Sequence, residues 1–119
     1  MVVLGDLNDE PDAATTQLLL GPPGSEIGTG GFNQPDQGDG QRLWNLAPRI
    51  PVEERFTRVY RGQPQLIDHI LVSHVLVQVV ADGDVTTGDT SPPSVTNNPT
   101  GRRNEPGSDH RPLVADIRF

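Results

Sequence analysis

The sequence predicts a loop-rich α/β fold in which short strands dominate. Its 119 residues include 13 Gly and 12 Pro, and together they exceed the average share of about 12%, which disfavours a helical bundle or a coiled coil. Leu, Ile, Val and Phe make up about a quarter of the chain, above the roughly 20% below which disorder is expected. Runs of β-branched residues from residue 56 onward are typical of strands. We therefore expect one domain with one modest core.

The chain opens with one strand and one helix. The β-branched run Val2–Leu4 predicts a buried strand, which places the polar residues 6–9 at its carboxyl end, where functional sites tend to gather. Residues 13–20 predict a short helix, with Asp12 as its N-cap and the following Gly-Pro-Pro as its end.

The next segment has little periodicity. Residues 21–42 are rich in Gly, Pro, Gln and Asp and predict a loop. Leu43–Leu46 predict a single turn that buries Trp44, and we expect this indole to pack in the core rather than to stack on a nucleobase.

The second half of the chain predicts strands. Phe56–Tyr60 and Leu66–Ser73 flank residues 61–65, a connection of plausible length for a β-hairpin. Val75–Val80 predict a third strand. The arginines near the hairpin are expected to be ordinary exposed strand residues, with contact to substrate phosphates as the alternative; they are Arg55, Arg58 and Arg61.

The chain closes with a loop and a strand. Residues 82–108 are polar and contain four Pro, which predicts a long loop, and loops of this length are usually functional or mobile. Apolar side chains alternate with others from Leu113 to Phe119, which predicts a strand with one apolar face. Strands that open and close the chain suggest that part of a larger sheet is missing, but a small domain that begins with a strand is common, and composition alone favours this second interpretation.

Charge and composition exclude several kinds of site. The net charge is −7, and the nine basic residues are all Arg, so the chain lacks the broad basic surface that grips nucleic acid through phosphates alone. A phosphate ligand would have to meet local Arg, backbone amides or a bound cation. Without Cys there is no disulfide scaffold, thiolate nucleophile or zinc–thiolate site. No apolar run approaches the roughly 18–20 residues of a membrane span.

Polar groups suited to catalysis gather in three segments. Asp6 and Asn8 follow the first strand, Asp68 lies within an apolar strand, and Asp109 with His110 precede the last strand. Most of these residues are also typical of turns and loop caps, but Asp68 is not, because strands disfavour Asp. A carboxylate among apolar neighbours needs a partner, since a buried unpaired charge is costly.

One histidine is the predicted partner of Asp68. Side chains alternate along a strand, so His69 points to the opposite face and is expected to be a packed residue. His74 lies six positions along the chain. His110 remains, and we expect its imidazole to contact the Asp68 carboxylate.

Three motifs in this order carry a family resemblance. GDLN at residues 5–8, RFTRVYRGQPQLIDHILVS at residues 55–73 and SDHRPL at residues 108–113 resemble the C-terminal half of the endonuclease/exonuclease/phosphatase superfamily. The hairpin segment is most similar to secreted bacterial nucleases. The resemblance implies an α/β fold that is half of a four-layer sandwich, with mixed β-sheets flanked by helices and the N-terminal half missing. Residues 1–119 would then be the C-terminal portion of one domain, with 82–108 as a long loop within it.

The resemblance implies a role for each site residue. Asp6 matches the acid that orients or deprotonates the attacking water, and Asn8 matches the carboxamide that positions it and donates to the phosphate. Asp68 matches the acid that holds the catalytic imidazole, and His110 matches that imidazole. Asp109 matches a carboxylate at the metal site, shared with Asp6, for Mg²⁺ or alternatively Mn²⁺ or Ca²⁺.

The implied function is a metal-dependent phosphodiester hydrolase, most similar to a nuclease acting on DNA or RNA. A phosphatase or a phospholipid phosphodiesterase of the same fold is the alternative, and a non-catalytic truncated half-domain is another. Arg102 and Arg103 are candidates for substrate contact because they precede the Asp109–His110 pair. The family's first half supplies a metal-binding Glu that has no counterpart here, so we expect this chain alone to be inactive. The resemblance also implies an extracellular or periplasmic protein, although the chain carries no signal segment.

Overall fold

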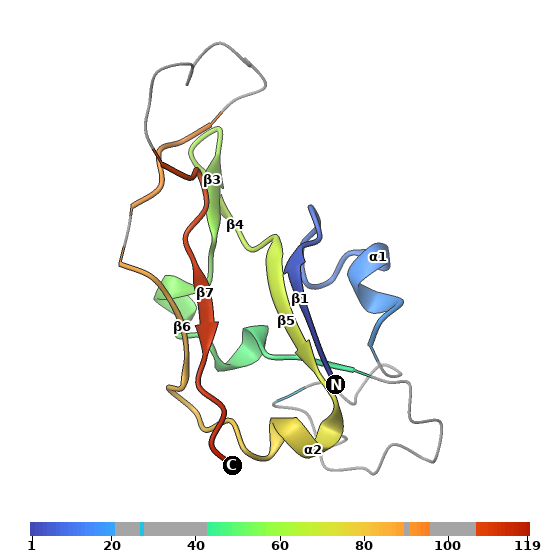
Figure 1. Ribbon diagram of the computed structural model, residues 1–119. Coiled ribbons are helices and arrows are strands. Elements are labelled where there is room, and N and C mark those ends of the chain that lie inside the picture. Colours follow the sequence, from blue (N-terminus) through green and yellow to red (C-terminus); the bar gives the residue numbers. More distant parts are fainter. Residues whose placement is uncertain (21–26, 28–42, 90, 96–106) are drawn as a thin grey trace.

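The computed structural model describes residues 1–20, 27, 43–89, 91–95 and 107–119. These residues form an α/β fold with antiparallel sheets and few helices (Figure 1). In chain order the elements are β1 (Val2–Asp6), α1 (Ala14–Gln17), β2 (Trp44–Asn45), the 3₁₀ turns η1 (Ala47–Arg49) and η2 (Val52–Glu54), β3 (Arg58–Tyr60), β4 (Gln63–Gln65), β5 (Asp68–Val72), α2 (His74–Val77), β6 (Val85–Thr87) and β7 (Leu113–Ala115).

β5 is the middle strand of a three-stranded sheet with the order β1-β5-β2. β1 pairs antiparallel with β5 along its whole length, from Val2 opposite Val72 to Asp6 opposite Asp68. β2 pairs antiparallel with the other edge of β5. Because directly opposite residues of an antiparallel pair are neighbours on one face, this register brings the two aspartates together.

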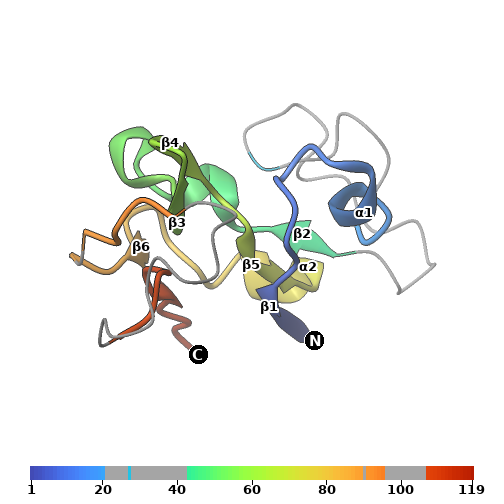
Figure 2. The same ribbon diagram turned by 90° about the horizontal axis from the view of Figure 1, so that it is seen from above.

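Two smaller sheets flank β5. β3 and β4 form a tight hairpin whose turn residues Arg61 and Gly62 have φ angles of 49° and 78°, as tight hairpin turns require. β6 and β7 form the other antiparallel pair. Both pairs lie on one side of β5, whereas α1 lies on the other (Figure 2). An isolated bridge between Arg58 and His110 joins β3 to the segment that leads into β7.

The hydrophobic core forms where β5 and β2 pack against η1, α2 and β6. Each fully buried Leu, Ile or Val side chain stabilises the fold by about 1.5–3 kcal/mol relative to an exposed one. The most deeply buried members of the core are Leu46, Ile50, Val72, Val77, Val80 and Val85, each at most 2% exposed.

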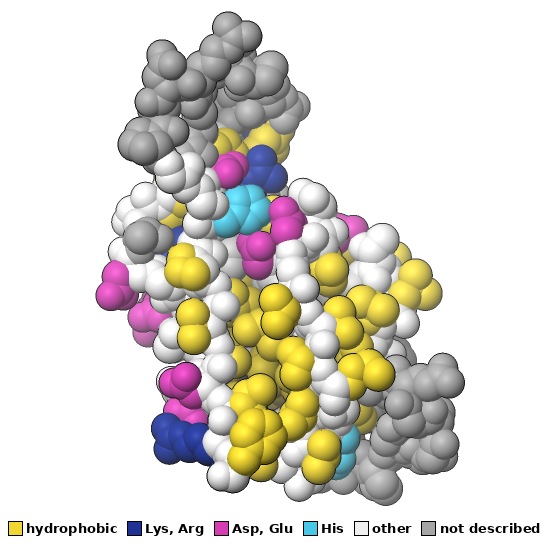
Figure 3. Space-filling view, in the orientation of Figure 1, with side chains coloured by type: hydrophobic (Ala, Val, Ile, Leu, Met, Phe, Trp, Pro, Cys, Tyr) yellow, Lys and Arg dark blue, Asp and Glu magenta, His cyan; other side chains and the backbone are white. Residues whose placement is uncertain are grey.

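The opening strand is present but is not buried as expected. Val2, Val3 and Leu4 are 42%, 37% and 71% exposed. β1 is an edge strand that contacts the described residues mainly through β5. Hydrophobic side chains accordingly lie open over the middle of one face (Figure 3).

The first helix is shorter than expected and has a different cap. α1 spans only Ala14–Gln17, and its N-cap is Ala13 rather than Asp12, with no side-chain cap hydrogen bond. The expected last turn does not continue the helix: Leu18 and Leu19 are 84% and 38% exposed, and Leu20 instead forms an isolated parallel bridge with Leu43. The predicted Gly-Pro-Pro stop and nearly all of the 21–42 loop lie outside the described residues.

Two apolar segments take the opposite structure to the expected one. Residues 43–46 were predicted to form a turn, yet Trp44 lies in strand β2 and is 3% exposed, so its place in the core is confirmed. Val75–Val80 were predicted to form a strand but begin with helix α2. Val77, the last residue of α2, and Val80, in the turn that follows it, are buried, whereas Val75 is 70% exposed.

The hairpin and the long loop also differ from the predictions. The segment expected to connect two strands itself supplies β4, while β5 belongs to the other sheet. The 82–108 segment contains β6, and its Val95 is buried and bridges to Tyr60, so the part that the structure describes is not a bare loop. The final strand ends at Ala115, and Phe119 is fully exposed.

Candidate active site

Three segments distant in sequence meet at one end of β5. The β1–β5 register places Asp6 across from Asp68. Arg111 donates its backbone N–H to the carbonyl oxygen of Thr57 at 2.7 Å, which holds the segment before β7 against the start of β3. Acidic and histidine side chains consequently gather on this face, beside the exposed hydrophobic area (Figure 3).

Asp68 and His110 form the pair that the sequence predicted. His110 Nδ1 lies 2.7 Å from Asp68 Oδ2, and the two side chains are 21% and 20% exposed. Because an ionised carboxylate can only accept, Nδ1–H donates and Nε2 is the ring nitrogen left for a ligand. The fully buried Thr57 hydroxyl accepts the Asp68 backbone N–H at 3.3 Å, which fixes the carboxylate's backbone in turn.

Asp6 and Asn8 stand beside this pair. The backbone N–H of Asn8 donates to Asp6 Oδ1 at 2.8 Å, and Asn8 adopts a left-handed backbone with φ of 55°, a conformation that Asn tolerates better than most residues. One ligand atom each from Asp6, Asp68 and His110 lie within 4.8 Å of one another. The structure thus brings three of the predicted site residues to one point.

The profile of the Endonuclease/Exonuclease/phosphatase family matches residues 1–110, which include all three of these side chains. The chain belongs to this family. Family membership indicates a hydrolase of the nuclease or phosphatase type, and the family's nucleases act on nucleic acid. No curated protein and no solved structure gives a significant match. Among the described residues, no helix has the length and hydropathy that crossing a membrane needs.

Enzymes of this family typically depend on a divalent metal. The residues that converge here could provide some, but not all, of the ligands of such a metal. Carboxylate oxygens suit Mg²⁺, Mn²⁺ and Ca²⁺. Asp6 and Asp68 offer such oxygens at the exposed end of the cluster. Glu10 does not belong to the group that converges there, and its Oε2 accepts the backbone N–H of Leu66 at 3.1 Å. The described residues therefore supply only part of a coordination shell.

The other predicted site residues lie elsewhere. Asp109 is not one of the converging residues; its Oδ2 lies 3.9 Å from Arg58 Nε, in a partly exposed ion pair. Its predicted sharing of a cation with Asp6 stays a prediction. Arg102 and Arg103 lie outside the described residues.

A polar cavity that the sequence did not predict opens beside Asn8. Its volume is about 310 Å³, and its lining includes a partly buried arginine that was expected to be exposed. The guanidinium of Arg58 lies 5.3 Å from the centre of the Tyr60 ring, a cation–π distance. The cavity is lined by Asn8, Asp9, Glu10, Arg58, Tyr60, Gln65 and Ile67.

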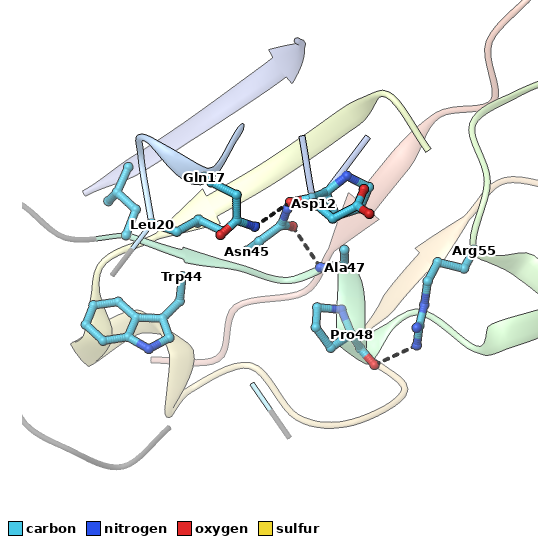
Figure 4. A pocket seen from close by; sticks show the side chains of 10 residues that line it. Asp12, Gln17, Leu20, Trp44, Asn45, Ala47, Pro48 and Arg55 are labelled. Atoms are coloured by element: carbon cyan, nitrogen blue, oxygen red, sulfur yellow. Dashed lines mark hydrogen bonds between the residues drawn. The ribbon is translucent and has the colours of Figure 1, made fainter. Parts of the chain in front are cut away.

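A more apolar cavity of about 330 Å³ lies between α1 and the β2–η1 segment (Figure 4). Trp44 and Asn45 form part of its wall, and Arg55 closes one side by donating to the carbonyl oxygen of Pro48 at 2.9 Å. None of the catalytic candidates lines it. Figure 4 also shows the Asn45 carboxamide bound to the backbone N–H of Ala47.

Proposed function

We propose that this chain carries the reacting residues of a metal-dependent phosphodiesterase, a nuclease acting on DNA or RNA. The observation that carries the proposal is the Asp68–His110 pair at 2.7 Å, with Asp6 beside it. Family membership supports the hydrolase class. The choice of a nuclease within that class rests on the resemblance of the hairpin segment to bacterial nucleases.

Asp6 would act on the attacking water. Its carboxylate is exposed and lies at the mouth of the cluster, so it can accept a proton from a water placed against phosphorus. The backbone N–H of Asn8 holds Asp6 Oδ1, and the Asn8 carboxamide is free to donate to a phosphoryl oxygen. A divalent cation bound by Asp6 and Asp68 would stabilise the negative charge that develops on the phosphate.

His110 would stabilise the phosphoryl oxygen from the other side. Asp68 fixes the ring with Nδ1–H toward its carboxylate, which directs Nε2 to the substrate. The carboxylate also keeps the ring oriented while charge develops on the phosphate. The mechanism therefore needs both members of the pair.

We further propose that the chain is one half of a four-layer sandwich and that the remainder of the domain completes the site. Two observations support this: the described residues give only part of a metal shell, and the apolar side chains of β1 are exposed. A secreted enzyme is also part of the proposal and rests on the resemblance alone. The extended protein is this chain joined to the proposed remainder of its domain.

The test is hydrolysis of bis(p-nitrophenyl) phosphate and p-nitrophenyl phosphate by this chain and by the extended protein, with Mg²⁺ or Mn²⁺ and with EDTA. We expect the extended protein to cleave the diester, to need the cation and to lose activity in His110→Ala. His74→Gln is the matched control, because His74 lies against Trp44, away from the cluster.

Preference for the monoester would replace the proposal by a phosphatase. An extended protein that cleaves neither substrate nor supercoiled plasmid would favour a non-catalytic domain. Activity that survives His110→Ala would overturn the role assigned to the pair.

A further inference from the structure

His69 is a buried histidine that the mechanism does not use. It lies on β5 next to Asp68 and is 2% exposed. Its Nε2 lies 2.7 Å from the carbonyl oxygen of Asp9, and its Nδ1 lies 3.1 Å from Nδ2 of the buried Asn45. Asn45 Oδ1 in turn accepts the backbone N–H of Ala47 at 2.9 Å.

The groups at the two ends of this series of hydrogen bonds determine which atoms donate and which accept. A carbonyl oxygen can only accept, so the His69 Nε2 must carry the proton that it donates to Asp9. The Ala47 N–H can only donate, so it fixes the Asn45 carboxamide with its oxygen toward η1 and its NH₂ toward His69. Nδ1 is then the acceptor of a neutral ring, and the side-chain N and O atoms of His69 and Asn45 all have suitable partners.

This series of hydrogen bonds ends at Asp9, in the loop that follows Asp6 and carries Asn8. Asn8 has its left-handed backbone between two anchored neighbours. On one side Leu7 donates its backbone N–H to the Ile67 carbonyl oxygen at 2.9 Å, and on the other side Asp9 is held by His69. Asn tolerates positive φ but does not require it, and the two anchored neighbours fix it here.

We propose that His69 is a positioning residue, which clamps the loop of residues 7–9 to β5 through Asp9, so that Asn8 and the Asp6 carboxylate that its N–H holds keep the geometry needed for hydrolysis. Asn45 serves the same clamp by holding His69 in the neutral form protonated at Nε2. The inference rests on the proposed function for its kinetic consequence, but the clamp itself is a property of this chain.

Two amide substitutions separate the clamp from simple packing. In His69→Gln the side-chain NH₂ can reach the position of Nε2 and still donate to Asp9, whereas in His69→Asn the amide replaces only Nδ1. Both variants remove the aromatic ring, and Asn is smaller than Gln by one methylene group. If His69 served packing alone, the two variants would differ in stability by that methylene group but not in kcat.

The kinetic test compares both variants in the extended protein, using bis(p-nitrophenyl) phosphate. We expect kcat of His69→Asn to fall about 10- to 100-fold, as for lost groups that orient reacting residues, with KM changed less than about threefold. His69→Gln should recover most of kcat, and His74→Asn is the control for loss of a histidine elsewhere. Equal kcat values in the Gln and Asn variants would overturn the proposal.

Hydrogen exchange tests the clamp without any activity. In this 119-residue chain, the amides of residues 7–9 should exchange faster in His69→Asn than in His69→Gln, with the β5 amides as the reference for global stability. Equal exchange in the two variants refutes the clamp. A difference in exchange, together with no hydrolysis by the wild-type extended protein, would retain the clamp and reject the proposed function.

The tautomer has a spectroscopic signature. A carboxylate in Asn45→Asp keeps the bond from the Ala47 N–H but can no longer donate to His69. The imidazole ¹⁵N spectrum should show Nδ1 as an unprotonated nitrogen in the wild type and as a protonated one in Asn45→Asp. A protonated Nδ1 in the wild type would contradict the proposed direction of the hydrogen bonds.

Discussion

Replacing Asp68 by Asn removes one negative charge from the site and nearly keeps the shape of the side chain, so it weakens both the pair with His110 and the proposed cation site. His110 Nδ1 donates to Asp68 Oδ2 at 2.7 Å, and both side chains are only about one-fifth exposed, so solvent screens the pair incompletely. A hydrogen bond to a charged group contributes about 1.5–3 kcal/mol. At about 1.36 kcal/mol for each tenfold change in rate, the substitution should slow hydrolysis about 10- to 150-fold.

The assay is the steady-state rate of diester hydrolysis by the extended protein, with the imidazole ¹⁵N spectrum of His110 recorded in parallel. An Asn can present either its oxygen or its NH₂ to Nδ1, so we expect the His110 ring to populate both tautomers, protonated at Nδ1 or at Nε2. The Asp68 backbone bond to Thr57 does not involve the carboxylate, so the fold should remain. A rate within about threefold of the wild type would refute the role given to the pair, since that corresponds to less than about 1 kcal/mol.

Three further predictions concern packing and the cation. Gly88→Ala should lower the free energy of unfolding in urea by about 1–3 kcal/mol, because its Cβ would lie 2.6 Å from Pro112 Cγ; an unchanged urea midpoint would show that Pro112 moves aside at little cost. Leu46→Ala, at a side chain 1% exposed, should lower the free energy of unfolding by about 2–5 kcal/mol. Val52→Ala, at a side chain 77% exposed, should change it by less than about 0.5 kcal/mol. Similar losses of stability in both variants would contradict the assignment of the core. EDTA should abolish diester hydrolysis and added Mn²⁺ should restore it; activity that persists in EDTA would rule out a metal-dependent mechanism.

Part of the site could be predicted from residue types and strand geometry alone. An aspartate within an apolar strand requires a partner, and strand alternation turns His69 away, which leaves His110. The position of Asp6 beside Asp68 also depends on strand register, and nothing in the residues of β1 and β5 specifies that these strands pair antiparallel in that register. The convergence of all three on one point needed the structure.

The His69 clamp could not be predicted, because its partners lie 24 and 60 residues away in the sequence. Neither partner belongs to a recognisable motif: one is an Asn in a two-residue strand and the other is a backbone carbonyl. The polar cavity beside Asn8 was missed for a similar reason. Arg58 has the pattern of an exposed strand residue; strand alternation puts Tyr60 on the same face, but only the fold places Asp109 beside it.

The errors in secondary structure have one common cause. A β-branched run such as Val75–Val80 favours a strand by propensity, but packing decides: Val77 at the end of α2 and Val80 just beyond it both reach the core, and the segment that holds them is helix and turn. The same competition explains β1, whose apolar residues form the predicted strand yet remain exposed. Sequence periodicity reports which residues are apolar, whereas burial depends on what packs against them.

The most direct test of the central claim, that a divalent cation binds at Asp6 and Asp68 beside His110, is paramagnetic line broadening by Mn²⁺ in NMR spectra of this chain. The first signals to broaden should be those of these three residues, and Asp6→Asn should raise the Mn²⁺ concentration required. Broadening that begins instead at acids outside the cluster, such as Glu53 and Glu54 in η2, and that is unchanged by Asp6→Asn, would contradict the account.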